Sequence, residues 1–111
     1  MEGVHNFSMK RNYELAFVVR IDSTEEAVND VVNLVQSWVV GENTGSIIKM
    51  DRWGRRKLAY EIDKQREGYY VILTAEIDTQ NLPELERNLK LSPSILRYLI
   101  VRADEDKPQT K

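Results

Sequence analysis

Apolar and polar residues alternate from Tyr13 to Ile21, which predicts a strand with two different faces. One face would carry Tyr13, Leu15, Phe17 and Val19, and the other Glu14, Ala16, Val18 and Arg20. A helix to about Val40 is expected next, because Ser23 to Glu26 has the sequence of a capping box and Gly41 supplies a left-handed stop. Its buried stripe at helical spacing would be Val28, Val31, Val32, Val35 and Val39, with Trp38 at the edge.

The second half of the chain repeats this kind of pattern. Ser46 to Ile62 is one long extended stretch, and Gly54 predicts a bulge or bend near Trp53. Gln65 to Gly68 is expected to turn, and Tyr69 to Ile77 alternates as a strand. Asn81 would cap a second helix with Leu82, Leu85 and Leu89 buried, Ser92 and Pro93 would break it, and Ile95 to Arg102 would be the last strand.

The order of these elements is β-α-β-β-α-β. Right-handed crossovers turn that order into an α+β ferredoxin-like sandwich, a four-stranded antiparallel sheet with both helices on one face. The strands that begin at Tyr13 and Tyr69 should be central, and those that begin at Ser46 and Ile95 should be edges. One face of the sheet is then left for water or a partner.

The chain of 111 residues has the length of one domain, expected over residues 12–102. Residues 1–11 lack periodicity and residues 103–111 are charged, so both are expected to be disordered. There is no cysteine and no apolar run of membrane-spanning length, which favours a cytoplasmic protein without membrane contact.

Charge is distributed unevenly, although the formal net charge is only −2. Residues 22–45 contain five acids and no base, whereas residues 49–67 contain seven bases and four acids. A near-neutral total therefore conceals an acidic and a basic part of the surface.

The sequence lacks the residues that enzymes and metal sites need. The only histidine, His5, lies in the N-terminal extension, and the five glycines are scattered rather than gathered in a phosphate-binding loop. Glu25, Glu26 and Asp30 are expected on the outer face of the first helix as solvated charges. We therefore predict no catalytic residue, no metal, no cofactor and no small-molecule substrate.

The residues from Trp53 to Tyr70 are the informative stretch. Arg55, Arg56 and Lys57 lie next to aromatic residues on an expected strand. In RNA-binding proteins, basic side chains contact phosphates and aromatic rings stack on nucleobases. Charged edge strands also protect sheets from aggregation. The spacing alone leaves RNA binding and a plain solvated edge equally open.

These motifs resemble one family. The Trp53-Gly54 bend, the following bases, Leu58-Ala59-Tyr60, Ile62 and the Gly68-Tyr69 pair are similar to the sixth protein of the bacterial small ribosomal subunit, over about Lys10 to Ala103. The chain departs from the common family pattern at Glu61, where proline is frequent.

The resemblance implies a non-enzymatic ribosomal protein in the cytoplasm. It implies binding to the central domain of small-subunit ribosomal RNA, in a heterodimer with the eighteenth small-subunit protein. The RNA-binding residues carried over are Lys10, Arg11, Arg55, Arg56, Lys57, Lys64 and Arg97. Candidate contacts to RNA or partner are Trp53, Tyr60 and Tyr69.

Two other classes remain open for this fold. One is a ferredoxin-like regulatory domain that binds a small molecule at a sheet edge, although no Gly-rich effector loop is present. The other is an acylphosphatase-like enzyme, which would need an arginine and an asparagine above an anion-binding loop.

Overall fold

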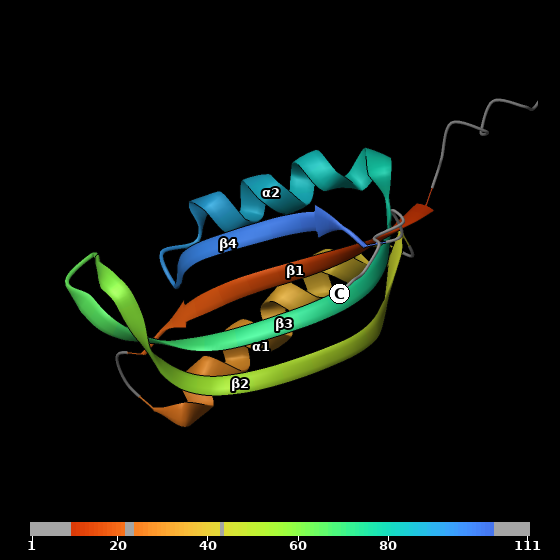
Figure 1. The fold of residues 1–111 in the computed structure, drawn as a ribbon. Helices are drawn as coiled ribbons and strands as arrows, with labels where there is room; N and C mark the ends of the chain where they lie inside the picture. Colours follow the sequence, from red (N-terminus) through yellow and green to blue (C-terminus); the bar gives the residue numbers. More distant parts are fainter. Residues whose placement is uncertain (1–9, 22–23, 43, 104–111) are drawn as a thin grey trace, which may run out of the picture.

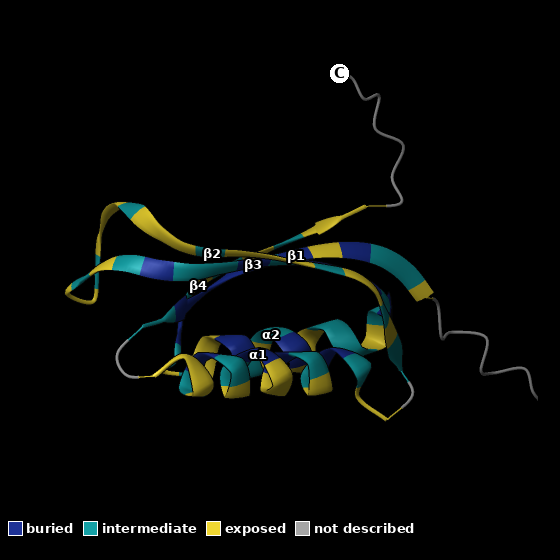
Figure 2. Ribbon diagram, turned by 90° about the horizontal axis from the view of Figure 1, so that it is seen from below, coloured by how far each residue is buried: buried dark blue, intermediate teal, exposed yellow. Residues whose placement is uncertain are grey.

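The computed structural model describes residues 10–21, 24–42 and 44–103. The elements follow in the order β1 (Lys10–Arg20), α1 (Glu25–Val40), β2 (Gly45–Ile62), β3 (Gln65–Asp78), the 3-10 turn η2 (Thr79–Asn81), α2 (Leu82–Leu91) and β4 (Ile95–Arg102). The strands form one sheet in the order β2-β3-β1-β4, and every neighbouring pair is antiparallel (Figure 1). Both helices lie on the same face of the sheet (Figure 2). The predicted ferredoxin-like sandwich is confirmed, with β1 and β3 central.

The core lies between the sheet and the two helices. Because side chains alternate along a strand, the residues of β1 and β3 with odd numbers point at the helices. The fully buried members include Leu15, Phe17, Val19, Val71, Leu73 and Ile77. The helices contribute the predicted valine stripe of α1, except for the half-buried Val31, and Leu85 and Leu89 of α2. Trp38 packs at the edge of this cluster, as predicted.

The helix starts differ from the prediction. The N-cap of α1 is Thr24, whose hydroxyl accepts a hydrogen bond from the Ala27 amide at 3.1 Å, whereas the predicted cap Ser23 lies outside the described residues. Asn81 precedes α2 without a side-chain cap, because the chain first makes η2. Asp78 caps that turn by accepting from the Gln80 amide at 3.0 Å.

β1 begins three residues before the predicted Tyr13. Lys10, Arg11 and Asn12 pair with Asp78, Ile77 and Glu76 of β3, so the predicted disorder is wrong for Lys10 and Arg11, which belong to the sheet. Backbone pairing with a long central strand overrides the weak strand pattern of these polar residues. The predicted disorder of residues 1–9 and 104–111 concerns segments outside the described residues.

The turn between β2 and β3 was also predicted in the wrong place. It consists of Asp63 and Lys64, with φ of 50° and 65°, and β3 already begins at Gln65. Two consecutive residues with positive φ make the tight hairpin turn whose twist matches that of the flanking strands. Asp tolerates this conformation, which allows the turn without glycine.

Bulges interrupt the pairing of both edge strands, and two of them bear on the predictions. The register of β2 on β3 shifts between Arg52 and Gly54, where Gly54 has φ of 84°, which confirms the predicted bend. In β4, Val18 pairs with Arg97 and Val19 with Ile95, so Leu96 is an extra residue. Bulges of this kind change the direction of the neighbouring side chains.

Leu73→Ala should lower the free energy of unfolding by about 2–5 kcal/mol, because it opens a cavity in the layer between sheet and helices. Leu99→Ala is the matched control, since Leu99 is 62% exposed on the other face and its loss should cost less than about 1 kcal/mol. Urea unfolding followed by circular dichroism measures both. Equal losses would contradict the assignment of the buried face.

Candidate nucleic-acid interface

The hairpin of β2 and β3 projects beyond the rest of the sheet (Figure 1). The ladder between β1 and β3 ends where Arg20 pairs with Gly68, so residues 57–67 have only their own hairpin partner beside them. We call these residues the arm. Arg56 pairs with Gly68 at the base of the arm, and Lys57 pairs with Glu67 at its first position. The exposed bases at the base and along the arm are Arg55, Arg56, Lys57, Lys64 and Arg66.

Two arginines lie over aromatic rings in this region. The guanidinium of Arg56 lies 5.5 Å from the centre of the Trp53 ring, and that of Arg97 lies 5.6 Å from the Tyr60 ring. Arg97 also donates a hydrogen bond to the Tyr60 hydroxyl at 2.8 Å. Trp53 and Tyr60 are exposed, so their rings and the arginines over them lie at the surface.

Ion pairs occupy some of these charges. Arg55 bonds Glu67 at 3.1 Å across the hairpin, which leaves its guanidinium less available to a ligand. Arg20, from the end of β1, bonds Asp63 in the turn of the arm. Within the described parts of the chain, Arg56, Lys57, Lys64, Arg66 and Arg97 make no ion pair with an acid.

The Arg20 contact also sets the ionisation of Asp63. The hydrogen bond from Arg20, together with its positive charge, holds the pKa of the Asp63 carboxyl below the ordinary value of 3.8. The same guanidinium donates through Nε to the Pro93 carbonyl at 3.1 Å. Arg20 therefore links the turn of the arm to the loop that precedes β4.

Both helices cover one face of the sheet, which leaves the other face without helices (Figure 2). A shallow hollow there is lined by Ala16, Val18, Tyr70 and Leu99, with Arg97 at its rim. Ile72 and the 45% exposed Val101 extend the same surface, which we call the open face. The open face therefore adjoins the basic region through Arg97.

The chain is similar to known proteins over most of its length. The family model described as ribosomal protein S6 matches residues 12–102. Small ribosomal subunit protein bS6 of Thermoanaerobacter pseudethanolicus is 42% identical over 86% of this chain and 99% of its own, and that of Moorella thermoacetica is 41% identical over 86% and 97%. The crystal structure of 30S ribosomal protein S6 from Thermotoga maritima superposes with a TM-score of 0.79 at 36% identity, over 86% of this chain and 89% of that one.

The chain belongs to the ribosomal protein S6 family. It is thus a protein of the small ribosomal subunit, and the predicted family is confirmed. Its relatives are ribosomal proteins rather than named enzymes. The fold of a solved S6 protein is the fold found here.

The structure of this S6 family member separates the predicted RNA-binding residues into two groups. Arg55, Arg56, Lys57, Lys64 and Arg97 lie at or near the arm. Lys10 and Arg11 lie at the opposite end of β1, about 30 Å from the arm at the usual rise of a strand. Arg102 of β4, which the sequence analysis did not select, pairs with Tyr13 near that second group.

The aromatic candidates also separate. Trp53 and Tyr60 are exposed near the arm, but Tyr69 packs against the core and lines a hollow beside Val28 of α1. Tyr70, which we did not select, is the tyrosine on the open face. The alternation of β3 predicts that Tyr70 lies on the open face, because residue 70 must point opposite to the buried Val71.

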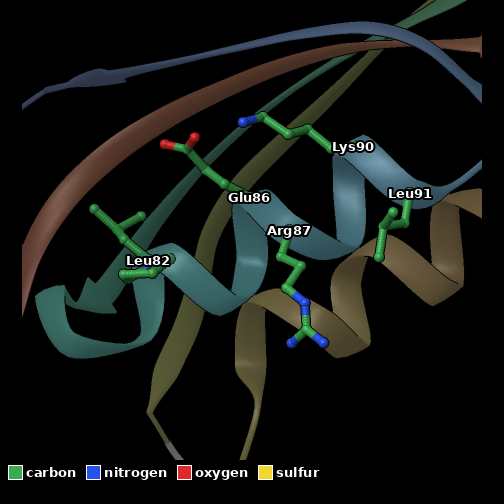
Figure 3. A pocket seen from close by; sticks show the side chains of 6 residues that line it. Leu82, Glu86, Arg87, Lys90 and Leu91 are labelled. Carbon is green, nitrogen blue, oxygen red and sulfur yellow. The ribbon is translucent and has the colours of Figure 1, made fainter.

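The other hollows on the described surface lack the features of a ligand-binding site. A hollow on α2 is lined by Leu82, Pro83, Glu86, Arg87, Lys90 and Leu91, and Figure 3 shows Glu86 and Lys90 extending on one side of the helix and Arg87 on another. Its polar groups do not converge as in a metabolite site. Among residues 10–21, 24–42 and 44–103, no three acidic or imidazole groups gather as metal ligands. No helix of that part is long and apolar enough to cross a membrane.

Arg20→Gln should raise the pKa of Asp63 toward its ordinary value of 3.8. Because the folded-state pKa is lowered, the contact stabilises the fold above the unfolded-state pKa and is lost as the pH falls through the folded-state pKa. The difference in stability between the two proteins should therefore be larger at pH 7 than in acid below pH 3.8, where only the bond to Pro93 still distinguishes them. Carbon NMR titration of Asp63, with urea unfolding at each pH, measures this. Arg20→Lys, which keeps the charge, should shift the pKa less, and an unchanged midpoint in Arg20→Gln would contradict the contact.

Proposed function

We propose that this chain is a non-enzymatic structural component of the cytoplasmic small ribosomal subunit. It binds the central domain of small-subunit ribosomal RNA, together with the eighteenth small-subunit protein as its heterodimer partner. The observation that carries the proposal is the group of bases without acidic partners at one end of the molecule, beside exposed aromatic rings: Arg56, Lys57, Lys64, Arg66 and Arg97. Membership of the ribosomal protein S6 family supports it.

These basic side chains are better suited to contact RNA phosphates than to recognise the edges of nucleobases. Arg56 and Lys57 are paired with β3, Lys64 lies in the two-residue turn, and Arg97 is held by its hydrogen bond to Tyr60. Cations at fixed spacing bind a phosphate backbone and release its counterions, which sets the position of the RNA more than its sequence. The exposed rings of Trp53 and Tyr60, next to Arg56 and Arg97, also offer surfaces on which a nucleobase can stack.

The second group of basic residues would set the orientation of the RNA along the sheet. Lys10 and Arg11 lie at the far end of β1 from the arm, with Arg102 beside them on β4. A single RNA helix can follow the sheet between the two groups, since about 30 Å corresponds to a typical helical turn of a nucleic-acid duplex. The arm supplies most of the charge, and this second group fixes the orientation.

The acidic part of the chain faces elsewhere. Glu25, Glu26 and Asp30 are exposed on α1, in the layer that covers the opposite side of the sheet from the open face. Like charges repel phosphate, so RNA approaches the arm and the strands rather than the helices. The formal net charge of −2 makes the long-range attraction to RNA weak, which favours binding together with a second, basic protein.

The open face supports a protein partner next to the RNA. Exposed apolar groups rimmed by polar ones mark protein interaction surfaces, and here Leu99, Val101 and Tyr70 have Arg97 at their rim. A partner on this face would share Arg97 with the RNA. Its binding and RNA binding would therefore reinforce each other, which is how two proteins of moderate affinity form a stable complex.

The double variant Arg56→Ala and Lys57→Ala should weaken binding to a central-domain RNA fragment by roughly ten- to a hundredfold, because each removed phosphate contact loses counterion release. For the wild type with about four to six phosphate contacts, log affinity should fall with log salt at a slope of roughly −3 to −5. Filter binding at several salt concentrations, with the eighteenth protein present, measures both. The slope of the variant should be shallower by about 2.

The matched control is the double variant Arg87→Ala and Lys90→Ala. It removes the same charge from the exposed side of α2, away from the arm, and should leave affinity within about twofold. If both double variants weaken binding equally, net charge rather than the arm determines affinity. A slope near zero, or no binding with or without the partner, would overturn the proposed function.

Leu99→Asn should weaken binding of the eighteenth protein in the absence of RNA by about tenfold or more, because it puts an amide at the centre of the open face. Leu91→Asn on α2 is the control, since Leu91 is even more exposed and lies in the other layer. Calorimetric titration of the two proteins measures the affinity. Loss of binding with Leu91→Asn but not with Leu99→Asn would place the partner on the helices.

A further inference from the structure

Tyr60 and Arg97 connect the two edge strands of the sheet. Tyr60 belongs to β2 and Arg97 to β4, and two other strands lie between these in the sheet order. Nevertheless, Nη1 of Arg97 bonds the Tyr60 hydroxyl at 2.8 Å, and the guanidinium lies 5.6 Å from the ring centre. The arm must therefore curve back over the open face to reach β4.

The backbone of both strands is adapted to this contact. The bulge at Leu96 in β4 precedes Arg97, which pairs with Val18 and points to the open face. Such a bulge redirects the side chains that follow it toward a specific target. The structure of β4 thus aims Arg97 at the arm rather than along the strand.

Gly68 supplies the space beneath the contact. A Cβ at this position would collide with Val18 Cγ1, and would lie 3.5 Å from Leu58 Cδ2 and 3.7 Å from Leu96 Cδ1. Side chains from the arm, from β1 and from the β4 bulge therefore meet over one glycine. This small apolar cluster packs the base of the arm against β1 and β4, and the contact between Tyr60 and Arg97 adds a second connection between the arm and β4.

The pairing leaves Arg97 able to bind a ligand. A guanidinium has five N–H donors, and Tyr60 accepts one of them. Arg97 is exposed, and no acid of the described residues forms an ion pair with it. A fixed arginine loses less side-chain entropy on binding phosphate than a free one, because its rotamer is already selected.

We propose that Tyr60 is a positioning residue for RNA binding, which acts by holding Arg97 and the arm in one fixed arrangement over the open face. The inference rests on the proposed function. Arg97 contacts the RNA phosphate, whereas Tyr60 acts only through Arg97. The hydroxyl of Tyr60 fixes the direction of the guanidinium, and its ring fixes the distance of the arm from β4.

A double-variant cycle separates this role from a direct contact. The variants are Tyr60→Phe, which removes the hydroxyl, Tyr60→Leu, which also removes the ring, and each of these with Arg97→Ala. Tyr60 is 60% exposed, so both substitutions are compatible with folding. The probe is the central-domain RNA fragment with the eighteenth protein present, at several salt concentrations.

We expect Arg97→Ala to weaken RNA binding roughly tenfold and to make the salt slope shallower by about 0.7–0.9, as for one lost phosphate contact. Tyr60→Phe should weaken binding about threefold and Tyr60→Leu about tenfold, with an unchanged salt slope because no charge is removed. In the Arg97→Ala background neither should change affinity by more than about twofold. Equal losses in both backgrounds would show that Tyr60 contacts RNA itself, and would overturn the positioning role.

A measurement on the free protein tests the contact independently of RNA. Amide exchange of residues 57–67 should accelerate about threefold or more in Tyr60→Leu and equally in Arg97→Ala, with no further increase in the double variant. Exchange in the core of β1 should stay unchanged. If the arm exchanges at the wild-type rate in all variants, the positioning role is wrong even where RNA binding stands. If the arm loosens but the wild type binds no RNA, the contact stands and the proposed function fails.

Discussion

The burial of one face of β1 and β3 against the helices determines the register of the sheet and which side chains reach its other face. Leu15, Phe17, Leu73 and Ile77 are sealed against the two helices, and a shift of either strand by one residue would expose all of them to water. The register of the two central strands is therefore fixed by the core alone. The same alternation places Ala16, Val18, Tyr70 and Ile72 on the other face, which no helix covers. A surface for a partner is thus a direct consequence of a core built from a single layer of helices.

The long hairpin is the second consequence of a fixed register. β3 continues past the end of β1, so the arm has no third strand beside it. An isolated two-stranded ribbon is marginally stable in water. Here contacts from outside the ribbon stabilise it, namely Arg20 to the turn and Arg97 to Tyr60. The bases on the arm therefore owe their fixed positions to arginines on β1 and β4, rather than to the hairpin itself.

Patterns with a strong period were predictable from sequence, and the features decided by tertiary contacts were not. The valine stripe of α1 and the central strands followed from periods of 3.6 and 2, and Gly54 predicted its own bulge. The turn at Asp63 and Lys64 was missed because it has no glycine, and its conformation is favoured by the pairing of strands on either side. The start of β1 was missed because polar residues acquire strand structure from β3. Among site residues, the sequence selected Arg97 and Tyr60 separately, 37 positions apart, and carried no sign that they touch.

The distribution of charge explains why an acidic chain belongs to an assembly rich in RNA. The acids of α1 lie in one layer, whereas the exposed basic residues Arg56, Lys57, Lys64, Arg66 and Arg97 lie on the arm or next to it. Of the three acids of the arm, Asp63 bonds Arg20 and Glu67 bonds Arg55, and Glu61 is exposed. Each such ion pair neutralises one carboxylate that would repel phosphate, and it uses one arginine to do so. What remains is a small number of cations in fixed positions, which gives orientation rather than high affinity. Under the proposed function, a protein of this kind would depend on a neighbour for affinity, and the open face beside Arg97 would place that neighbour next to the same RNA.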